Sequence, residues 1–71
     1  MPLELRAHIT GTVWKIEKKP GDSVQAGEVV LILESMKLEM PLESPASGTL
    51  EHLSCNEGDA VQEGQVLGLI T

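Results

Sequence analysis

This chain has few of the residues that build catalytic, metal or nucleic-acid sites, and these absences narrow its class. Of its 71 residues, one is cysteine (Cys55) and one is aromatic (Trp14). A single cysteine cannot form an internal disulfide, and His8, His52 and Cys55 lack the paired spacing of zinc ligands. Five basic residues against eleven acidic ones give a net charge of −6. This balance argues against nucleic acid as a partner, because phosphate binding requires clustered positive charge.

Long apolar runs are also missing. The first twenty residues alternate polar and apolar side chains, so they contain neither the apolar region of a secretion signal nor a membrane-spanning stretch. We therefore expect no membrane segment and, because a lone thiol suits a reducing compartment, a cytoplasmic protein. The length predicts one small domain, residues 1–71, with a core of valine, leucine and isoleucine.

The chain contains an internal repeat. Residues 10–33 align with residues 47–70 at an offset of 37, which pairs Gly11-Thr12 with Gly48-Thr49, Gly21-Asp22 with Gly58-Asp59, and Val24-Gln25 with Val61-Gln62. Two copies are too few for a solenoid and indicate two-fold pseudo-symmetry instead. Residues 1–4, Met-Pro-Leu-Glu, also recur at 40–43, two residues out of step with the rest.

Short strand-like segments alternate with turns in both copies. We expect eight strands, at residues 3–9, 12–17, 23–25, 29–33, 38–43, 49–53, 60–62 and 66–71. Pro41 predicts that its strand lies at a sheet edge, since proline cannot donate a hydrogen bond to a neighbouring strand. No helix is expected. The sequence therefore predicts an all-β domain, a flattened barrel or sandwich of two four-stranded antiparallel sheets with two-fold pseudo-symmetry.

Glycines fall at equivalent places in the two copies. We expect each of them to supply a backbone conformation with positive φ. Because they are dispersed rather than clustered before a helix, they do not predict a phosphate-binding loop.

The segment that joins the two copies must reverse the chain tightly. Two-residue hairpin turns usually hold asparagine or glycine, because their central residues need positive φ, but this segment reads Ser-Met-Lys. A conflict between local preference and required geometry is typical of functional sites. We expect Lys37 to project into solvent rather than pair with Glu34 or Glu39, with apolar Met36 and Leu38 exposed beside it for recognition.

Residues 34–39, Glu-Ser-Met-Lys-Leu-Glu, resemble the biotin-attachment motif of biotin carboxyl carrier domains, usually Glu-Ala/Ser-Met-Lys-Met-Glu. The resemblance covers nearly the whole chain, through the Gly-Asp-x-Val-x-x-Gly turn of both copies and Ser-Pro-Ala-Ser-Gly-Thr at 44–49. It implies that biotin protein ligase joins biotin to Lys37 through an amide. It further implies a non-catalytic carrier that takes carboxybiotin from a biotin carboxylase to a carboxyltransferase. Residues around Lys37 would serve recognition, namely Glu34, Ser35, Met36, Leu38 and Glu39.

Two positions depart from the family pattern. Leu38 replaces the usual methionine, and its similar volume predicts that attachment survives at an altered rate. Lys18 stands at a normally apolar position whose counterpart is Cys55, so its aliphatic stem is expected to cover the core while its ammonium reaches water. No insertion separates equivalent strands, so the protruding thumb of some bacterial carrier subunits is expected to be absent.

Two alternative functions stay open. A lipoyl carrier shares the fold and the lysine in the segment that joins the two copies, although in lipoyl carriers that segment usually reads Asp-Lys-Ala. An unmodified hammerhead module would act only as an interaction piece and would carry no adduct on Lys37.

Candidate residues outside residues 34–39 have simpler interpretations. Trp14 alternates with Val13, so one of the two faces outward, and we favour Trp14 as a cap on the core over a docking anchor. Cys55 is interpreted as a core filler rather than a nucleophile, because no activating neighbour is identifiable. His8 and His52 are interpreted as strand residues at the surface or the core rim.

Overall fold

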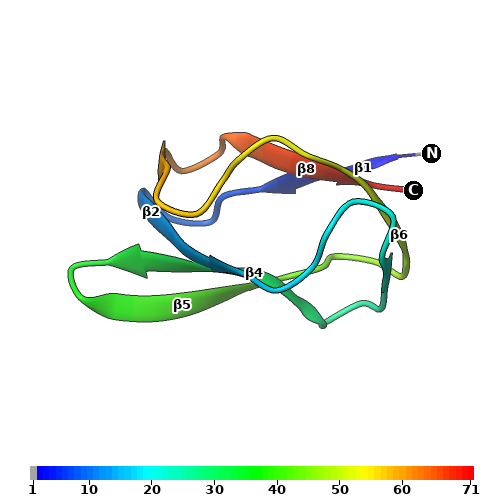
Figure 1. Cartoon of the computed structure of the whole chain (residues 1–71), viewed down its shortest axis with the longest axis horizontal. Helices are drawn as coiled ribbons and strands as arrows, with labels where there is room; N and C mark the ends of the chain where they lie inside the picture. The colour runs from blue at the N-terminus through cyan, green and yellow to red at the C-terminus, as the bar shows by residue number, and fades with distance from the viewer. Residues whose placement is uncertain (1) are drawn as a thin grey trace.

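The computed structural model describes residues 2–71, which form eight strands and no helix (Figure 1). The strands are β1 (Leu3–Arg6), β2 (Gly11–Ile16), β3 (Ser23–Val24), β4 (Val29–Ser35), β5 (Leu38–Glu43), β6 (Gly48–Leu53), β7 (Ala60–Val61) and β8 (Val66–Ile70). All eight expected strands are present, and the bounds of β5 are those predicted. Within the described residues there is accordingly no helix that could cross a membrane.

The strands divide into two antiparallel sheets of four. One sheet has the order β1-β8-β6-β3, and the other has the order β5-β4-β2-β7. We call the turn at the end of the β4–β5 hairpin the tip, and the second sheet, which contains this hairpin, the tip-side sheet. Strand β5 lies at its edge, as Pro41 predicted. The molecule measures 33 × 17 × 17 Å, and the β4–β5 turn lies at the opposite end from the start of β1 and the end of β8 (Figure 1).

Inward-facing residues of both sheets form one core. Leu31, Leu33, Leu50 and Leu67 are completely buried in it, and full burial of a leucine side chain stabilises a fold by about 1.5–3 kcal/mol. Cys55 belongs to the same cluster, which confirms its interpretation as a small core filler.

Hydrogen bonds repeat between the two copies. The amide of Gly27 donates to the carbonyl of Ser44 at 2.9 Å, and the amide of Gly64 donates to the carbonyl of Ala7 at 2.8 Å. The offset of 37 relates these two bonds, with donor and acceptor copies exchanged. The carboxylates of both Gly-Asp turns also accept from the amide three residues earlier, at 2.9 and 2.8 Å. The predicted two-fold pseudo-symmetry is therefore confirmed at the level of single bonds.

Strand register extends the offset of 37 to the first strand. Leu5 pairs with Gly68 in one sheet, and Leu42 pairs with Leu31 in the other. Because Gly68 and Leu31 are counterparts at the offset of 37, Leu5 is the counterpart of Leu42. The recurrence of Met-Pro-Leu-Glu is thus not the structural equivalence, and its first residue, Met1, lies outside the described residues.

Strand β1 ends at Arg6, three residues before the predicted end at Ile9. A bulge interrupts its pairing after Leu5, and the amide of Ala7 donates to the carbonyl of Gln65 at 2.9 Å. The chain then bends across to the other sheet through residues 8–10. Polar and apolar residues continue to alternate beyond Arg6, but the partner strand β8 begins at Val66, which pairs with Arg6. The sequence pattern cannot show where a partner strand begins or ends. Strand β4 instead runs two residues past its predicted end, because it pairs with β5 up to the turn.

Candidate functional site

A two-residue turn, Met36-Lys37, joins β4 to β5. Ser35 and Leu38 are the last paired residues of the hairpin, and Met36 and Lys37 have φ angles of 54° and 66°. They are the only two non-glycine residues with positive φ among residues 2–71. Positive φ at both central positions is the geometry of a type I′ turn, which strongly prefers Asn-Gly. The predicted conflict between sequence and geometry is therefore present in the structure.

The side chains of the turn stand in solvent. Met36 is 92 % exposed, Leu38 is 61 % exposed, and Lys37 is exposed between them. Within residues 2–71, the salt bridges are Arg6 with Glu4 and Lys18 with Glu28, so Lys37 has no ion-pair partner there. The structure thus presents an amine at the end of a hairpin whose strands are paired up to the turn, where another protein can reach it.

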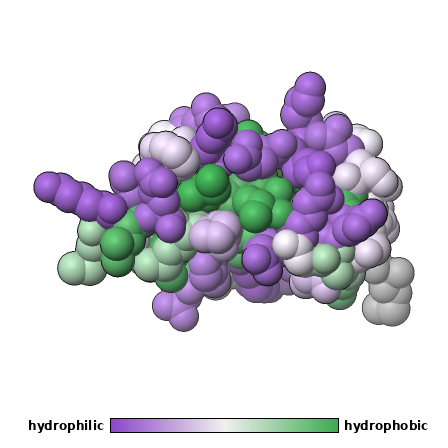
Figure 2. All heavy atoms as spheres, turned by 90° about the horizontal axis from the view of Figure 1, so that it is seen from below, coloured by the Kyte–Doolittle hydropathy of each residue, from purple (hydrophilic) through white to green (hydrophobic). Residues whose placement is uncertain are grey.

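One side of the hairpin continues the apolar core outward. Met40 pairs with the buried Leu33 and Leu42 pairs with the buried Leu31, so the stripe Leu42, Met40 and Leu38 lies on the core side of β5. Exposure increases along this stripe until Leu38, beside the turn, is mostly in water. Figure 2 shows apolar surface at the hairpin end of the molecule, beside a protruding hydrophilic side chain.

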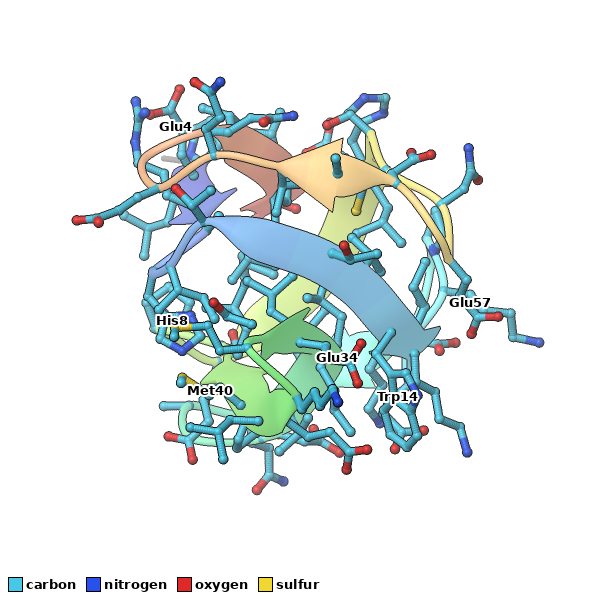
Figure 3. The ribbon with its side chains drawn as sticks, turned by 90° about the vertical axis from the view of Figure 1, so that its left-hand side faces the viewer. Glu4, His8, Trp14, Glu34, Met40 and Glu57 are labelled. Atoms are coloured by element: carbon cyan, nitrogen blue, oxygen red, sulfur yellow. The ribbon has the colours of Figure 1, made fainter. Side chains whose placement is uncertain are left out.

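Two acidic residues occupy the other side of the hairpin. Glu34 and Glu39 are directly opposite each other across β4 and β5, a placement in which like charges destabilise a sheet. In the described part of the chain neither carboxylate takes part in a salt bridge. The end view in Figure 3 places Glu34 near the centre, with His8 and Met40 on one side and Trp14 on the other.

Gly11 supports the base of the hairpin, for a reason that differs from the prediction. Positive φ occurs at the four glycines of the turns, Gly21, Gly27, Gly58 and Gly64. Gly11 and Gly48 do not have positive φ, so the prediction was wrong for them. A Cβ atom at Gly11 would overlap the carbonyl oxygen of Glu34, and one at Gly48 would overlap the carbonyl oxygen of Thr71. Gly11 therefore allows β2 to approach β4 closely where β4 leaves for the turn.

Trp14 does not cap the core. Val13 is buried, whereas Trp14 is 46 % exposed and points outward. The register of β2 against β4 shifts between Val13 and Lys15, so Trp14 is the extra residue of a β-bulge. In Figure 3 its ring lies outside the ribbon of the sandwich. Strand alternation showed that one of the two residues faces out, and the core decided which.

The other candidates lie away from the tip. Burial raises the pKa of the Cys55 thiol, with Asp59 adding to the effect. The Lys18 ammonium lies 2.7 Å from the Glu28 carboxylate. Their hydrogen bond raises the pKa of Lys18 and lowers that of Glu28. Both side chains remain partly exposed, so the Lys18 ammonium lies at the surface as expected, and its pairing with Glu28 is an additional contact that the sequence did not predict. His8 and His52 are exposed, and no three potential ligands gather into a metal site within residues 2–71.

Comparison with known proteins agrees with this architecture. A family model described as "Biotin-requiring enzyme" (biotin/lipoyl) matches residues 4–70. The biotin/lipoyl attachment protein of Bacillus subtilis is 44 % identical over 59 residues, which cover 83 % of this chain and 81 % of that protein.

Solved structures similar to this chain include carboxylases and a lipoyl domain. The Kluyveromyces lactis urea carboxylase matches with a TM-score of 0.93 and 34 % identity over the whole chain, which spans 6 % of that enzyme. The lipoyl domain of the 2-oxoglutarate dehydrogenase complex from Azotobacter vinelandii matches with a TM-score of 0.75 and 37 % identity, over 87 % of this chain and 78 % of the domain. Because the family model matches nearly the whole chain, and a biotin/lipoyl attachment protein of similar length is 44 % identical to it, this chain belongs to the biotin/lipoyl attachment family.

Proposed function

We propose that Lys37 is the residue to which a biotin protein ligase attaches biotin, and that the chain carries this group between a biotin carboxylase and a carboxyltransferase. The observation that carries the proposal is the turn itself. Lys37 is exposed on a strained two-residue turn, and it has no ion pair among residues 2–71 that would have to break before its amine could react.

The residues of the tip fit the covalent attachment of an acid. The neutral amine of Lys37 would attack the activated carboxyl carbon of biotin, form an amide, and lose a proton as the activating group departs. Once attached, biotin supplies a ureido nitrogen that takes up and releases a carboxyl group. The hairpin keeps the attachment point rigid, while the long lysine side chain allows the group to move between partners. Tethering raises the effective concentration of the group at each partner.

Biotin is favoured over lipoate by the tip sequence and by the overall structure. Met36 precedes the lysine as in the biotin-attachment motif, and neither Met36 nor Leu38 matches the usual lipoyl sequence Asp-Lys-Ala. The carboxylase match also has the higher TM-score, 0.93 against 0.75. The identity of 37 % to a lipoyl domain nevertheless supports a lipoyl carrier as the second candidate.

Intact mass spectrometry distinguishes the candidates. The chain is co-expressed with a biotin protein ligase and, separately, with a lipoate ligase, each with its acid in excess. We expect the mass of one biotinyl group in the first case, loss of that adduct in Lys37→Ala and Lys37→Arg, and no loss in the control Lys19→Arg, which changes another exposed lysine. A lipoyl adduct alone would favour the second candidate. No adduct with either ligase would indicate an unmodified interaction module.

A further inference from the structure

The internal repeat provides a comparison between the outer faces of the two sheets. Ile32 lies between the buried Leu31 and Leu33, so it faces outward from the tip-side sheet. It pairs with Lys15 of β2 and with Pro41 of β5, and Trp14 precedes Lys15 in the bulge. The resulting row, Trp14, Ile32 and Pro41, is the centre of what we call the Trp14 face.

The same row in the other sheet is mostly acidic. At the offset of 37 the counterparts of Trp14, Ile32 and Pro41 are Glu51, Leu69 and Glu4. Register confirms the equivalence, because Leu69 pairs with Glu4 on one side and with His52, the counterpart of Lys15, on the other. Trp14 and Glu51 both occupy bulges and are both exposed. The fold thus accepts a charged residue at this position, and its architecture does not explain an exposed tryptophan there.

The residues around the row also differ in charge between the two sheets, but in the opposite sense. Alternation along β4 and β5 places three glutamates on the Trp14 face, namely Glu34, Glu39 and Glu43. Their counterparts are Thr71, Pro2 and Arg6, which are neutral or positive. The Trp14 face is therefore an apolar row with an acidic rim, with Lys15 as its one basic member, and the opposite face lacks this pattern.

We propose that the Trp14 face docks the enzyme that acylates Lys37, through an apolar pocket rimmed by lysine and arginine on that enzyme. This inference rests on the proposed function. An enzyme that reacts with the Lys37 amine must contact the tip itself. Ile32 is three residues before Ser35, about 10 Å along the strand. An interface of standard size covers about 800 Å² on each partner, a patch of roughly 16 Å radius, so a patch that contains the turn has room to extend over the Trp14 face as well.

The chemistry of the face matches such a contact. Tryptophan is enriched among the residues that dominate binding energy. The acidic rim would attract a basic surface and accelerate its encounter. It also gives the opposed pair Glu34 and Glu39 a role, since their placement costs stability and no salt bridge within residues 2–71 compensates for it.

The test is steady-state biotinylation of the purified chain by the biotin protein ligase of its source organism, with the chain as the varied substrate. Trp14→Glu copies the counterpart residue Glu51, and we expect its KM to rise tenfold or more, a change of about 1.4 kcal/mol, with kcat within twofold of the unsubstituted chain. Glu43→Arg, which copies Arg6, should also raise KM, and added salt should raise the KM of the unsubstituted chain. The control Glu51→Ala, at the matching bulge of the other face, should leave KM unchanged.

Each other outcome has a defined meaning. An unchanged KM in Trp14→Glu, or an equal rise in Glu51→Ala, would overturn the docking assignment while biotinylation itself stood. Failure of the unsubstituted chain to accept biotin would overturn the proposed function and this assignment together. Thermal unfolding checks that Trp14→Glu is folded. If it is not, Pro41→Glu, which copies Glu4, provides the same comparison.

Discussion

Replacing Met36 by asparagine should stabilise the domain. The left-handed conformation costs a non-glycine residue roughly 1–2 kcal/mol, and Met36 holds it with φ of 54°. Asparagine tolerates this conformation better, because its side chain bonds locally to the backbone. The Met36 side chain is 92 % exposed, so its removal gives up almost no buried surface. We expect a gain of about 0.5–1 kcal/mol in the free energy of unfolding, which is roughly half of the conformational cost.

The gain is large enough to measure in a domain of this size. A change of 1 kcal/mol shifts the Tm of a 60–100-residue domain by about 4–8 °C, so we expect a rise of roughly 2–8 °C. Thermal unfolding of the unmodified chain is followed by far-ultraviolet circular dichroism, with urea unfolding as a second measure. The matched control is Met36→Ala, which removes the same exposed side chain without favouring positive φ and should change stability by less than about 0.5 kcal/mol. An asparagine variant no more stable than the alanine variant would refute the strain argument.

The same substitution separates stability from function. If Met36 contributes to recognition of the tip, Met36→Asn should be biotinylated more slowly than the unsubstituted chain although it is more stable. Such a result would explain why a turn that favours Asn-Gly contains Met-Lys instead.

Two further predictions concern Gly11, at the base of the hairpin, and the ion pair between Lys18 and Glu28. Gly11→Ala should destabilise the chain by about 1–3 kcal/mol in urea unfolding, because the added Cβ would force β2 away from the Glu34 carbonyl; a variant as stable as the parent would show that the strands separate without cost. Glu28→Gln should reduce the dependence of stability on pH in acid. The hydrogen bond from Lys18 lowers the pKa of Glu28 below its usual 4.5, so this stabilisation is present above about pH 4.5 and is lost as pH falls through the lower folded pKa. In urea unfolding, the free energies of unfolding of the parent chain and of Glu28→Gln should therefore differ at pH 7 and converge at pH 3. The difference at pH 7 should be smaller at high salt. Glutamine at this position copies Gln65 of the second copy, which makes the variant conservative. A difference that persists at pH 3 would exclude the ion pair as its cause.

Much of the fold could be predicted from the sequence because its signals are local. The repeat, the Gly-Asp turns and the alternation of apolar residues identified eight strands and two-fold pseudo-symmetry. The turn at Met36-Lys37 was also predictable, because two equivalent copies joined by so short a segment force that segment to reverse direction at the surface. The predicted exposure of Lys37 follows from the same argument.

Tertiary structure decided what alternation alone leaves open. Alternation with a period of two shows that neighbouring side chains face opposite ways, but it does not show which of them faces the core. Bulges, which the sequence pattern did not reveal, set the orientation of Trp14 and ended the pairing of β1 at Arg6. The reason for glycine at position 11 lies in the carbonyl of Glu34, 23 residues further along the chain. The rows of residues that distinguish the outer faces of the two sheets are likewise set by register between strands distant in sequence, and only the folded chain brings them together.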